Sequence, residues 1–176
     1  MEKKIEVVHT YTKDVLLPII KRVKSYMETE MKIDIFNVSE IAYPKNIHLK
    51  KNTIMLGTSG SIKLIITLGY DDILLNKLVE MFVDGDDVDD YESEEVRNSV
   101  ACEISNTIIG NAIDNPIDNS DIYITPPVLV SEAKTLYKDK FSKFVFVTFA
   151  TKYGDVQLTA VGPKEQFEEE LDFKEI

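Results

Sequence analysis

Residues 93–113 read SEEVRNSVACEISNTIIGNAI, and residues 124–130 read ITPPVLV. The first stretch predicts a long helix, because small and apolar residues recur at a spacing of three or four and fall on one helical face. These residues are Ala101, Ile104, Ile108 and Ala112. Ser93 is a suitable N-cap, so we expect the helix to begin there and to run to about Ile113. The second stretch predicts a strand that is entered through two prolines.

The opposite face of this helix carries polar and small residues, namely Ser99, Glu103, Asn106 and Gly110. Glu103 and Asn106 are three residues apart and therefore share one ridge of the helix. Asparagine is unfavourable in the middle of an exposed helix, because its side chain competes for backbone hydrogen bonds. Gly110, one turn further, would let the backbone of another protein approach closely. Helical phase predicts that Cys102 and Asn111 point toward the packed side.

The first part of the chain predicts a helix, a hairpin and a second helix. Residues at helical spacing in the first helix are Leu16, Ile19, Ile20, Val23 and Met27. Residues 54–68 predict a hairpin that turns at Gly57–Gly60. The second helix begins at about Asp71, and its predicted buried stripe is Ile73, Leu74, Leu78, Val79 and Phe82.

The remaining segments predict strands at residues 5–9, 122–124, 128–130, 144–149 and 156–161, and a loose acidic helix at residues 164–176. This order of elements predicts an α/β protein of the α+β, two-layer kind. Its antiparallel-rich sheet would carry the long helices on one face. A length of 176 residues fits a single domain that spans residues 1–176.

The sequence has 31 acidic and 20 basic residues, which gives a formal net charge of −11. This charge repels nucleic acid and anionic lipid, so we expect neither nucleic acid nor membrane as a partner. The single cysteine, Cys102, cannot form an internal disulfide. No apolar run has the length of a signal peptide or a membrane span, which predicts a cytoplasmic protein. If the protein acts on phosphate, the cations must come with the substrate.

Residues 84–95, DGDDVDDYESEE, raise the alternative of a metal-dependent hydrolase. A calcium loop of the EF-hand type needs a ligand at its fifth position and glycine at its sixth. Counted from Asp84, these positions hold Val88 and Asp89, so the pattern fails. The run is more typical of a solvated loop that leads into a helix. His9 and His48 lack partners for a metal or nucleophilic site and are expected to be ordinary surface histidines.

The stretch 93–113 followed by 124–130 resembles the CheX branch of the CheC, CheX and FliY family of chemotaxis phosphatases. The matching residues are the E-x-x-N pair Glu103 and Asn106, then Gly110-Asn111-Ala112, then Pro126-Pro127. The likeness covers most of the chain from about Ile54 to Val161. Members of the CheC branch carry a second E-x-x-N pair on the first helix, and residues 13–27 contain none. The resemblance therefore implies one site per chain and a homodimer joined through the sheets.

The resemblance also implies an activity and a partner. The activity is that of a hydrolase which removes phosphate from the aspartyl-phosphate of a CheY-like receiver domain, the response regulator of two-component signalling. Asn106 would orient the attacking water, and Glu103 would dock against a lysine of the receiver. Ser99 and Gly110 would belong to the partner-binding surface. Mg²⁺ would come with the receiver, so we expect no metal or cofactor on this chain. The alternative is a receiver-binding or motor-switch module of the same fold that catalyses nothing.

Overall fold

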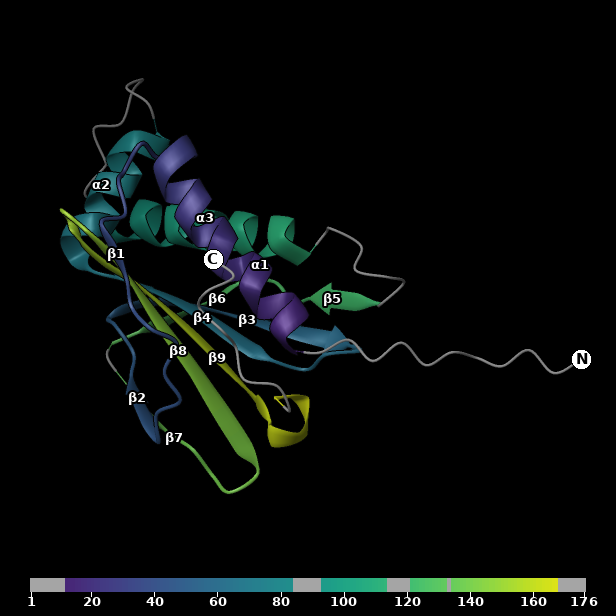
Figure 1. Cartoon of the computed structure of the whole chain (residues 1–176). Helices are drawn as coiled ribbons and strands as arrows, with labels where there is room; N and C mark the ends of the chain where they lie inside the picture. The colour runs from purple at the N-terminus through teal and green to yellow at the C-terminus, as the bar shows by residue number, and fades with distance from the viewer. Residues whose placement is uncertain (1–11, 84–92, 114–120, 133, 168–176) are drawn as a thin grey trace, which may run out of the picture.

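The computed structural model describes residues 12–83, 93–113, 121–132 and 134–167. Three α-helices cover one face of an antiparallel sheet, as Figure 1 shows. They are α1 (Thr12–Ser25), which continues into a π-helical turn (Tyr26–Glu30), α2 (Asp72–Phe82) and α3 (Glu94–Ile113). The predicted fold class, an antiparallel sheet with long helices on one face, is confirmed.

The strands in the described part of the chain form a seven-stranded sheet and a separate two-stranded ribbon. The large sheet has the order β1-β8-β9-β4-β3-β5, and β6 also pairs with β3. Its strands are β1 (Asn37–Val38), β3 (Asn52–Gly60), β4 (Ile65–Tyr70), β5 (Ile122–Ile124), β6 (Val128–Ser131), β8 (Ser142–Thr151) and β9 (Gly154–Pro163). The ribbon pairs β2 (Asn46–His48) with β7 (Thr135–Tyr137). The sequence did not predict these two short strands.

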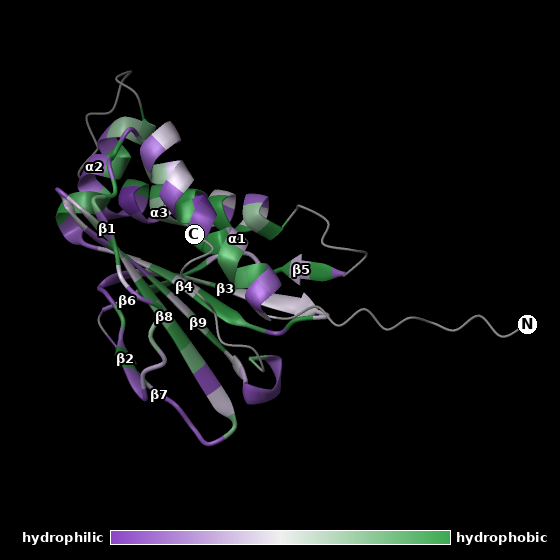
Figure 2. Ribbon diagram, viewed as in Figure 1, coloured by the Kyte–Doolittle hydropathy of each residue, from purple (hydrophilic) through white to green (hydrophobic). Residues whose placement is uncertain are grey.

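The helical layer packs on the sheet through the residues that the apolar spacing identified. In α1 and its π-helical continuation, every residue of the predicted stripe is fully buried: Leu16, Ile19, Ile20, Val23 and Met27. The colouring in Figure 2 shows hydrophobic residues along the strands beneath the helices. Because this apolar area is removed from water on folding, the packed layer is the main source of stability of the fold.

The second face of the sheet carries a smaller apolar cluster. Along β8, Val145 and Val147 face the helical layer, while the alternate residues Phe144 and Phe146 pack with Ile47 of β2. Side chains alternate between the two faces of a strand, so the β2–β7 ribbon lies on the face opposite the helices. β4 and β9 lie in the middle of the sheet and are mostly buried, including their polar residues Thr67, Gln157 and Thr159.

The first hairpin is confirmed, but its predicted turn is wrong. Gly57–Gly60 continues strand β3, and the chain reverses at residues 61–64. Thr58 holds this reversal, because its hydroxyl donates to the carbonyl of Ile62 at 2.8 Å and accepts the N–H of Leu64 at 2.9 Å. The end of β3 pairs with β5, which lies about 60 residues away in the sequence. Only this long-range pairing makes a strand of a segment that resembles a turn.

β5 and β6 pair with consecutive parts of β3, and the two prolines lie between them. Here Leu56 and Gly57 face the three residues 125–127, which makes a β-bulge. The N–H of Thr125 donates to the carbonyl of Gly57 at 2.9 Å, and its hydroxyl accepts the N–H of Gly57 at 2.8 Å. Proline has no N–H to donate. Pro126 and Pro127 therefore separate the hydrogen bonds between β3 and β5 from those between β3 and β6.

Two further predictions need correction or lie outside the described residues. Ile73 and Phe82, predicted for the buried stripe of α2, are exposed, and Leu75 is buried in their place. The predicted strand at residues 5–9 and residues 168–176 of the predicted C-terminal helix are not described. In the described part of this predicted helix, residues 164–167, the structure has only a 3₁₀ turn (Lys164–Gln166). In the described residues, no helix is long and apolar enough to cross a membrane.

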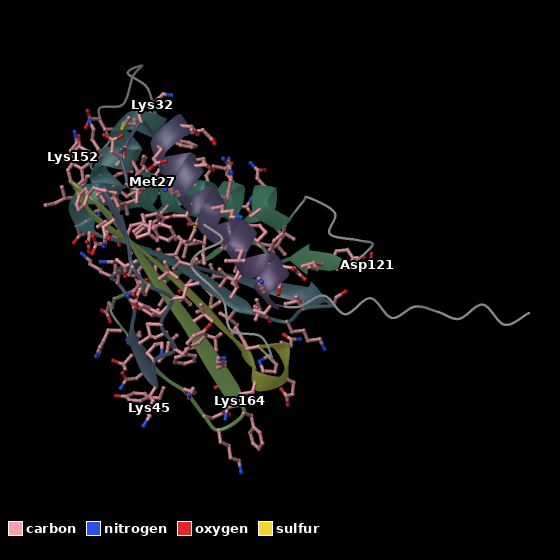
Figure 3. The ribbon with its side chains drawn as sticks, viewed as in Figure 1. Met27, Lys32, Lys45, Asp121, Lys152 and Lys164 are labelled. Atoms are coloured by element: carbon pink, nitrogen blue, oxygen red, sulfur yellow. The ribbon has the colours of Figure 1, made fainter. Side chains whose placement is uncertain are left out.

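The lysines labelled in Figure 3 lie at opposite ends of the molecule. Lys32 and Lys152 are near the end where α2 lies, whereas Lys45 and Lys164 are at the far end of the sheet. The labelled cations are therefore spread over the molecule and do not follow α3.

Candidate functional site

α3 begins with the cap that the sequence predicts. The N–H of Val96 donates to Ser93 Oγ at 3.2 Å, and the N–H of Arg97 donates to the carbonyl of Ser93 at 3.1 Å. Glu94 and Glu95 occupy the first turn, where the positive end of the helix dipole favours carboxylates. A serine cap stabilises a helix by about 1 kcal/mol. The cap thus determines where α3 begins. The helical period then determines on which face of α3 each later residue lies.

α3 is buried over a wide arc. The predicted face of Ala101, Ile104, Ile108 and Ala112 is buried, as expected. Val100, Ser105 and Ile109 are buried too, because α3 packs on β3 and also against α1 and α2. Sequence periodicity identified the centre of the arc but not its width, which depends on the two neighbouring helices.

The uncovered strip of α3 carries the predicted site residues, and we call it the α3 ridge: Ser99, Glu103, Asn106 and Gly110. The first three side chains are exposed, and Gly110 is half-buried. Within the part of the chain that the structure describes, the side chains of Glu103 and Asn106 make no hydrogen bond or ion pair. A partner can therefore reach both groups without breaking a contact inside this chain.

The Glu103 carboxylate acts electrostatically on Tyr26, which directly follows α1, but its charge is not neutralised there. Burial raises the pKa of the Tyr26 phenol, the carboxylates of Glu30 and Glu103 raise it further, and Arg22 opposes them. The Arg22 guanidinium stacks over the Tyr26 ring at 5.2 Å and pairs with Glu30. The nearby cation is thus engaged by another carboxylate, which leaves Glu103 available for a cation of a partner.

The buried side of α3 is held to the sheet by one hydroxyl pair. The Tyr70 and Ser105 hydroxyls lie 2.8 Å apart, and both residues are buried. Burial raises the pKa of the Tyr70 phenol above its ordinary value, so the phenol stays neutral. No sequence pattern identifies this pair, because its members are 35 residues apart and each resembles an ordinary core residue.

A second polar tie lies near the start of α3. An Arg97 guanidinium nitrogen donates to Asp72 Oδ1 at 2.9 Å, and the carboxamide of Asn52 donates to the same oxygen at 2.8 Å. The bond from Asn52, then that from Arg97, lowers the pKa of Asp72. This exposed ion pair joins the first turns of α2 and α3.

The end of the ridge is bordered by β5. Among the described residues, a Cβ placed on Gly110 would meet only the Ile124 Cδ1 atom, at 3.6 Å, which is an ordinary contact. Cys102 is half-buried and packs against the core as predicted. The prediction for Asn111 is wrong, because this residue is exposed. Near the last turn α3 extends past its helical neighbours, so residues outside the central arc become accessible.

The metal alternative gains no candidate ligands from the described residues. They hold no group of three His, Cys, Asp or Glu side chains that could bind an ion. Residues 84–92 of the acidic run lie outside the described residues, as does His9. His48 is exposed, and its Nδ1 lies 2.7 Å from the Thr135 hydroxyl, a contact that joins β2 to β7.

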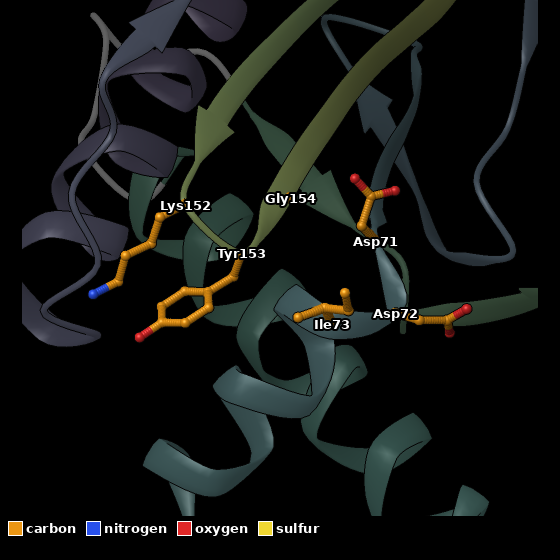
Figure 4. Close-up of a pocket in the computed structure, with 6 residues that line it drawn as sticks. All are labelled: Asp71, Asp72, Ile73, Lys152, Tyr153 and Gly154. Atoms are coloured by element: carbon orange, nitrogen blue, oxygen red, sulfur yellow. The ribbon is translucent and has the colours of Figure 1, made fainter.

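A separate pocket of about 450 Å³ lies where β8 turns into β9, and Figure 4 shows the residues that line it. The Asp71 carboxylate there accepts the N–H of Asp155 at 2.8 Å and pairs with Lys50. Gly154 has a φ of +120°, and a Cβ on it would come within 2.7 Å of Asp71 Cβ. The polar groups at this place thus hold the turn against α2, and no residue of the α3 ridge lines the pocket.

The comparisons with known proteins agree with this architecture. A family model described as chemotaxis phosphatase CheX matches residues 52–150, more than half of the chain. No curated protein matches the sequence.

Several solved structures are similar to this chain, and they include the following three. The chemotaxis protein CheX of Desulfovibrio desulfuricans has a TM-score of 0.69 at 14% identity, with 84% of this chain and 97% of that chain covered. CheX of Vibrio vulnificus has a TM-score of 0.64 at 14% identity, with coverages of 87% and 100%. The CheX–CheY–BeF₃–Mg²⁺ complex of Borrelia burgdorferi gives 0.62 at 19% identity, with coverages of 84% and 96%.

At these identities the solved structures establish a common fold, and the matching family model adds the sequence relationship over β3 to β8. That region includes the whole α3 ridge and the strands that support it. The chain belongs to the CheX family of chemotaxis phosphatases.

Proposed function

We propose that this chain hydrolyses the aspartyl-phosphate of a CheY-like receiver domain, with Asn106 orienting the attacking water and Glu103 docking against a lysine of the receiver. The observation that carries the proposal is the exposure of both side chains on one ridge of a helix that is otherwise packed and capped. A convex ridge needs a cavity in its partner, and the phosphorylated pocket of a receiver is such a cavity.

The reaction requires little covalent help from this chain. Water attacks the phosphorus, the bond from phosphorus to the aspartyl oxygen breaks, and the carboxylate leaves while the water proton passes to the released phosphate or to solvent. The transition state is loose, so much of the remaining barrier is the placement of water in line with the leaving oxygen. The Asn106 carboxamide oxygen accepts a hydrogen bond from that water, and the amide nitrogen donates to a neighbouring acceptor.

Glu103 has a different task in this proposal. Its carboxylate would form a charge-assisted bond with the lysine of the receiver and so seat the ridge in the pocket. Asn106 lies one turn further on the same ridge, so seating Glu103 also brings the carboxamide to the phosphoryl group. Ser99 and Gly110 would complete the contact at the two ends of the ridge.

Magnesium would be supplied by the receiver in this scheme, where it holds the phosphoryl oxygens. The presence of Mg²⁺ in the CheX–CheY complex of Borrelia burgdorferi supports this assignment. We further propose that the protein works in the cytoplasm, where phosphorylated receivers are found.

Gly110→Ala is expected to stabilise the fold and to weaken receiver binding. Within the described part of the chain the new methyl group meets only Ile124, at an ordinary distance, and replacing a helical glycine by alanine gains about 1 kcal/mol. A partner backbone packed against Gly110 would clash with the methyl group, at about tenfold lower affinity. Thermal unfolding and a titration with phosphorylated receiver measure the two effects. Unchanged affinity would remove Gly110 from the binding surface.

We also propose a homodimer formed through the sheet. In the described residues, β5 and β6 pair with β3 on one side only, and Tyr123 and Val128 on these edge strands are exposed. An open apolar edge favours pairing with another sheet. Light scattering is expected to give twice the monomer mass of 20.0 kDa. A monomer mass at micromolar and higher concentrations would contradict the dimer.

A further inference from the structure

The hydroxyl pair of Tyr70 and Ser105 lies beneath the α3 ridge. The two oxygens are 2.8 Å apart, and the residues are 1% and 0% exposed. Ser105 directly precedes Asn106 in the sequence and is the one polar residue among the buried residues of α3. The buried contact between α3 and its surroundings is thus apolar, except for one directional bond near the centre of the ridge; the Arg97–Asp72 pair ties the exposed start of the helix.

Tyr70 is a rigid anchor for this bond. It is the last residue of β4 and pairs with Asn52 of β3 on one side and with Val156 of β9 on the other. Asp71, the N-cap of α2, follows immediately. Strands on both sides therefore fix the backbone of Tyr70, and its hydroxyl is a reference point that belongs to the sheet.

Apolar packing alone specifies the position of a helix less sharply than a hydrogen bond does. The hydrophobic effect is non-directional, whereas a hydrogen bond weakens steeply when distance or angle changes. A helix displaced by one residue shifts by 1.5 Å and turns by about 100°. Contacts made by small and branched side chains such as Ala101 and Ile108 permit smaller shifts of the helix. A displacement of about 1 Å at a reacting group can lower the rate about 100-fold.

We propose that the Tyr70–Ser105 hydrogen bond is a positioning device that sets the rotation and height of α3, so that Asn106 is presented at the geometry which hydrolysis needs. Single buried polar contacts fix the register of packed helices in coiled coils in the same way. This inference rests on the proposed function for the statement of what is positioned. The structural part of the proposal, that the Tyr70–Ser105 bond sets the rotation and height of α3, does not depend on the proposed function.

The double variant Tyr70→Phe/Ser105→Ala tests the proposal, because it removes both hydroxyls and leaves neither one buried without a partner. We expect its melting temperature to stay within a few degrees of the wild type. We expect kcat for receiver dephosphorylation to fall about tenfold, with a smaller change in KM, at a temperature where both proteins are fully folded. Ser105→Ala alone leaves the Tyr70 hydroxyl unpaired and is expected to melt at a lower temperature than the double variant.

A matched control is the pair Thr67 and Thr159, which face each other across β4 and β9. Both residues are buried, and in the described structure their hydroxyls have no hydrogen-bond partner. Thr67→Val/Thr159→Val also removes two buried hydroxyls, but not a tie to α3. It is expected to keep the kcat of the wild type.

Wild-type kcat in the Tyr70→Phe/Ser105→Ala variant would overturn the positioning role. Amide hydrogen exchange supplies a readout that does not depend on catalysis. Faster exchange across residues 100–112, at unchanged global stability, is expected in the double variant, and unchanged exchange would also overturn the inference. If the wild type does not accelerate phosphate loss, the proposed function is wrong. The amide hydrogen exchange of residues 100–112 then still tests whether the Tyr70–Ser105 bond positions α3.

Discussion

Asn106→Ala is expected to lower the rate of receiver dephosphorylation at saturating receiver by about 100-fold. The carboxamide is the group that orients water in the proposed reaction, and removing one well-placed polar group from a transition state has an effect of this size. The affinity for phosphorylated receiver is expected to change less than about threefold, since docking depends on Glu103. The exposed position of Asn106 also means that stability is kept or slightly raised, because alanine is the better helix former.

The control for this variant is Asn76→Ala, which removes an exposed asparagine from the middle of α2. It should match the wild type in rate and affinity. Full turnover by Asn106→Ala would show that water is oriented by another group or not at all. A loss of affinity as large as the loss of rate would instead make Asn106 a docking residue.

Glu103→Ala is expected to weaken receiver binding by about 30-fold, which corresponds to about 2 kcal/mol for a charge pair that closes in an interface. The dephosphorylation rate at low receiver concentration should fall together with the affinity, because Asn106 reaches the phosphoryl group only while the receiver is bound. The loss should be larger at low salt, where the attraction between exposed charges is less screened. Titration of the phosphorylated receiver at two ionic strengths measures both effects.

Glu80→Ala on α2 is the control, since it removes one exposed carboxylate and changes the net charge equally; it also breaks the exposed ion pair with Lys77, which lies on α2 away from the ridge. Its affinity should stay near that of the wild type at both salt concentrations. Glu103→Gln separates shape from charge, and its affinity is expected to lie between those of the wild type and the alanine variant. An affinity in Glu103→Ala equal to that of the wild type would remove the docking role.

The long, locally coded elements were predictable from the sequence. Ser93 was identified as the cap of α3 because capping is a local interaction, and the buried face of α1 followed from spacing alone. The exposure of Glu103 and Asn106 followed in the same way, since helical phase places them opposite Ile104 and Ile108. Residue types and period therefore predicted the exposure of Glu103 and Asn106, but not that of Asn111 in the last turn.

Features that depend on distant parts of the chain were not predictable. Gly57–Gly60 has the composition of a turn, yet pairing with β5 makes it a strand. Ile73 has the spacing of a buried residue, but it lies in the first turn of α2 near the β8–β9 turn and stays exposed. The Tyr70–Ser105 pair needs the three-dimensional fold before either hydroxyl has a partner. In each case a tertiary contact outweighs the local preference.

The distribution of charge is consistent with the division of labour proposed here. A chain with a net charge of −11 would hold a phosphoryl group poorly without cations from elsewhere. On the α3 ridge it offers one uncompensated carboxylate beside one neutral carboxamide. Such a surface suits a partner whose pocket already contains positive charge around the phosphate.

The most direct measurement is phosphate loss from a phosphorylated CheY-like receiver, with magnesium, in the presence of increasing amounts of this chain or of Asn106→Ala. The account predicts that the wild type shortens the lifetime of the aspartyl-phosphate in proportion to its concentration, and that the variant binds the receiver but accelerates phosphate loss about 100-fold less. An aspartyl-phosphate lifetime that the wild type does not shorten, although it binds the receiver, would contradict the account and identify the chain as a binding module.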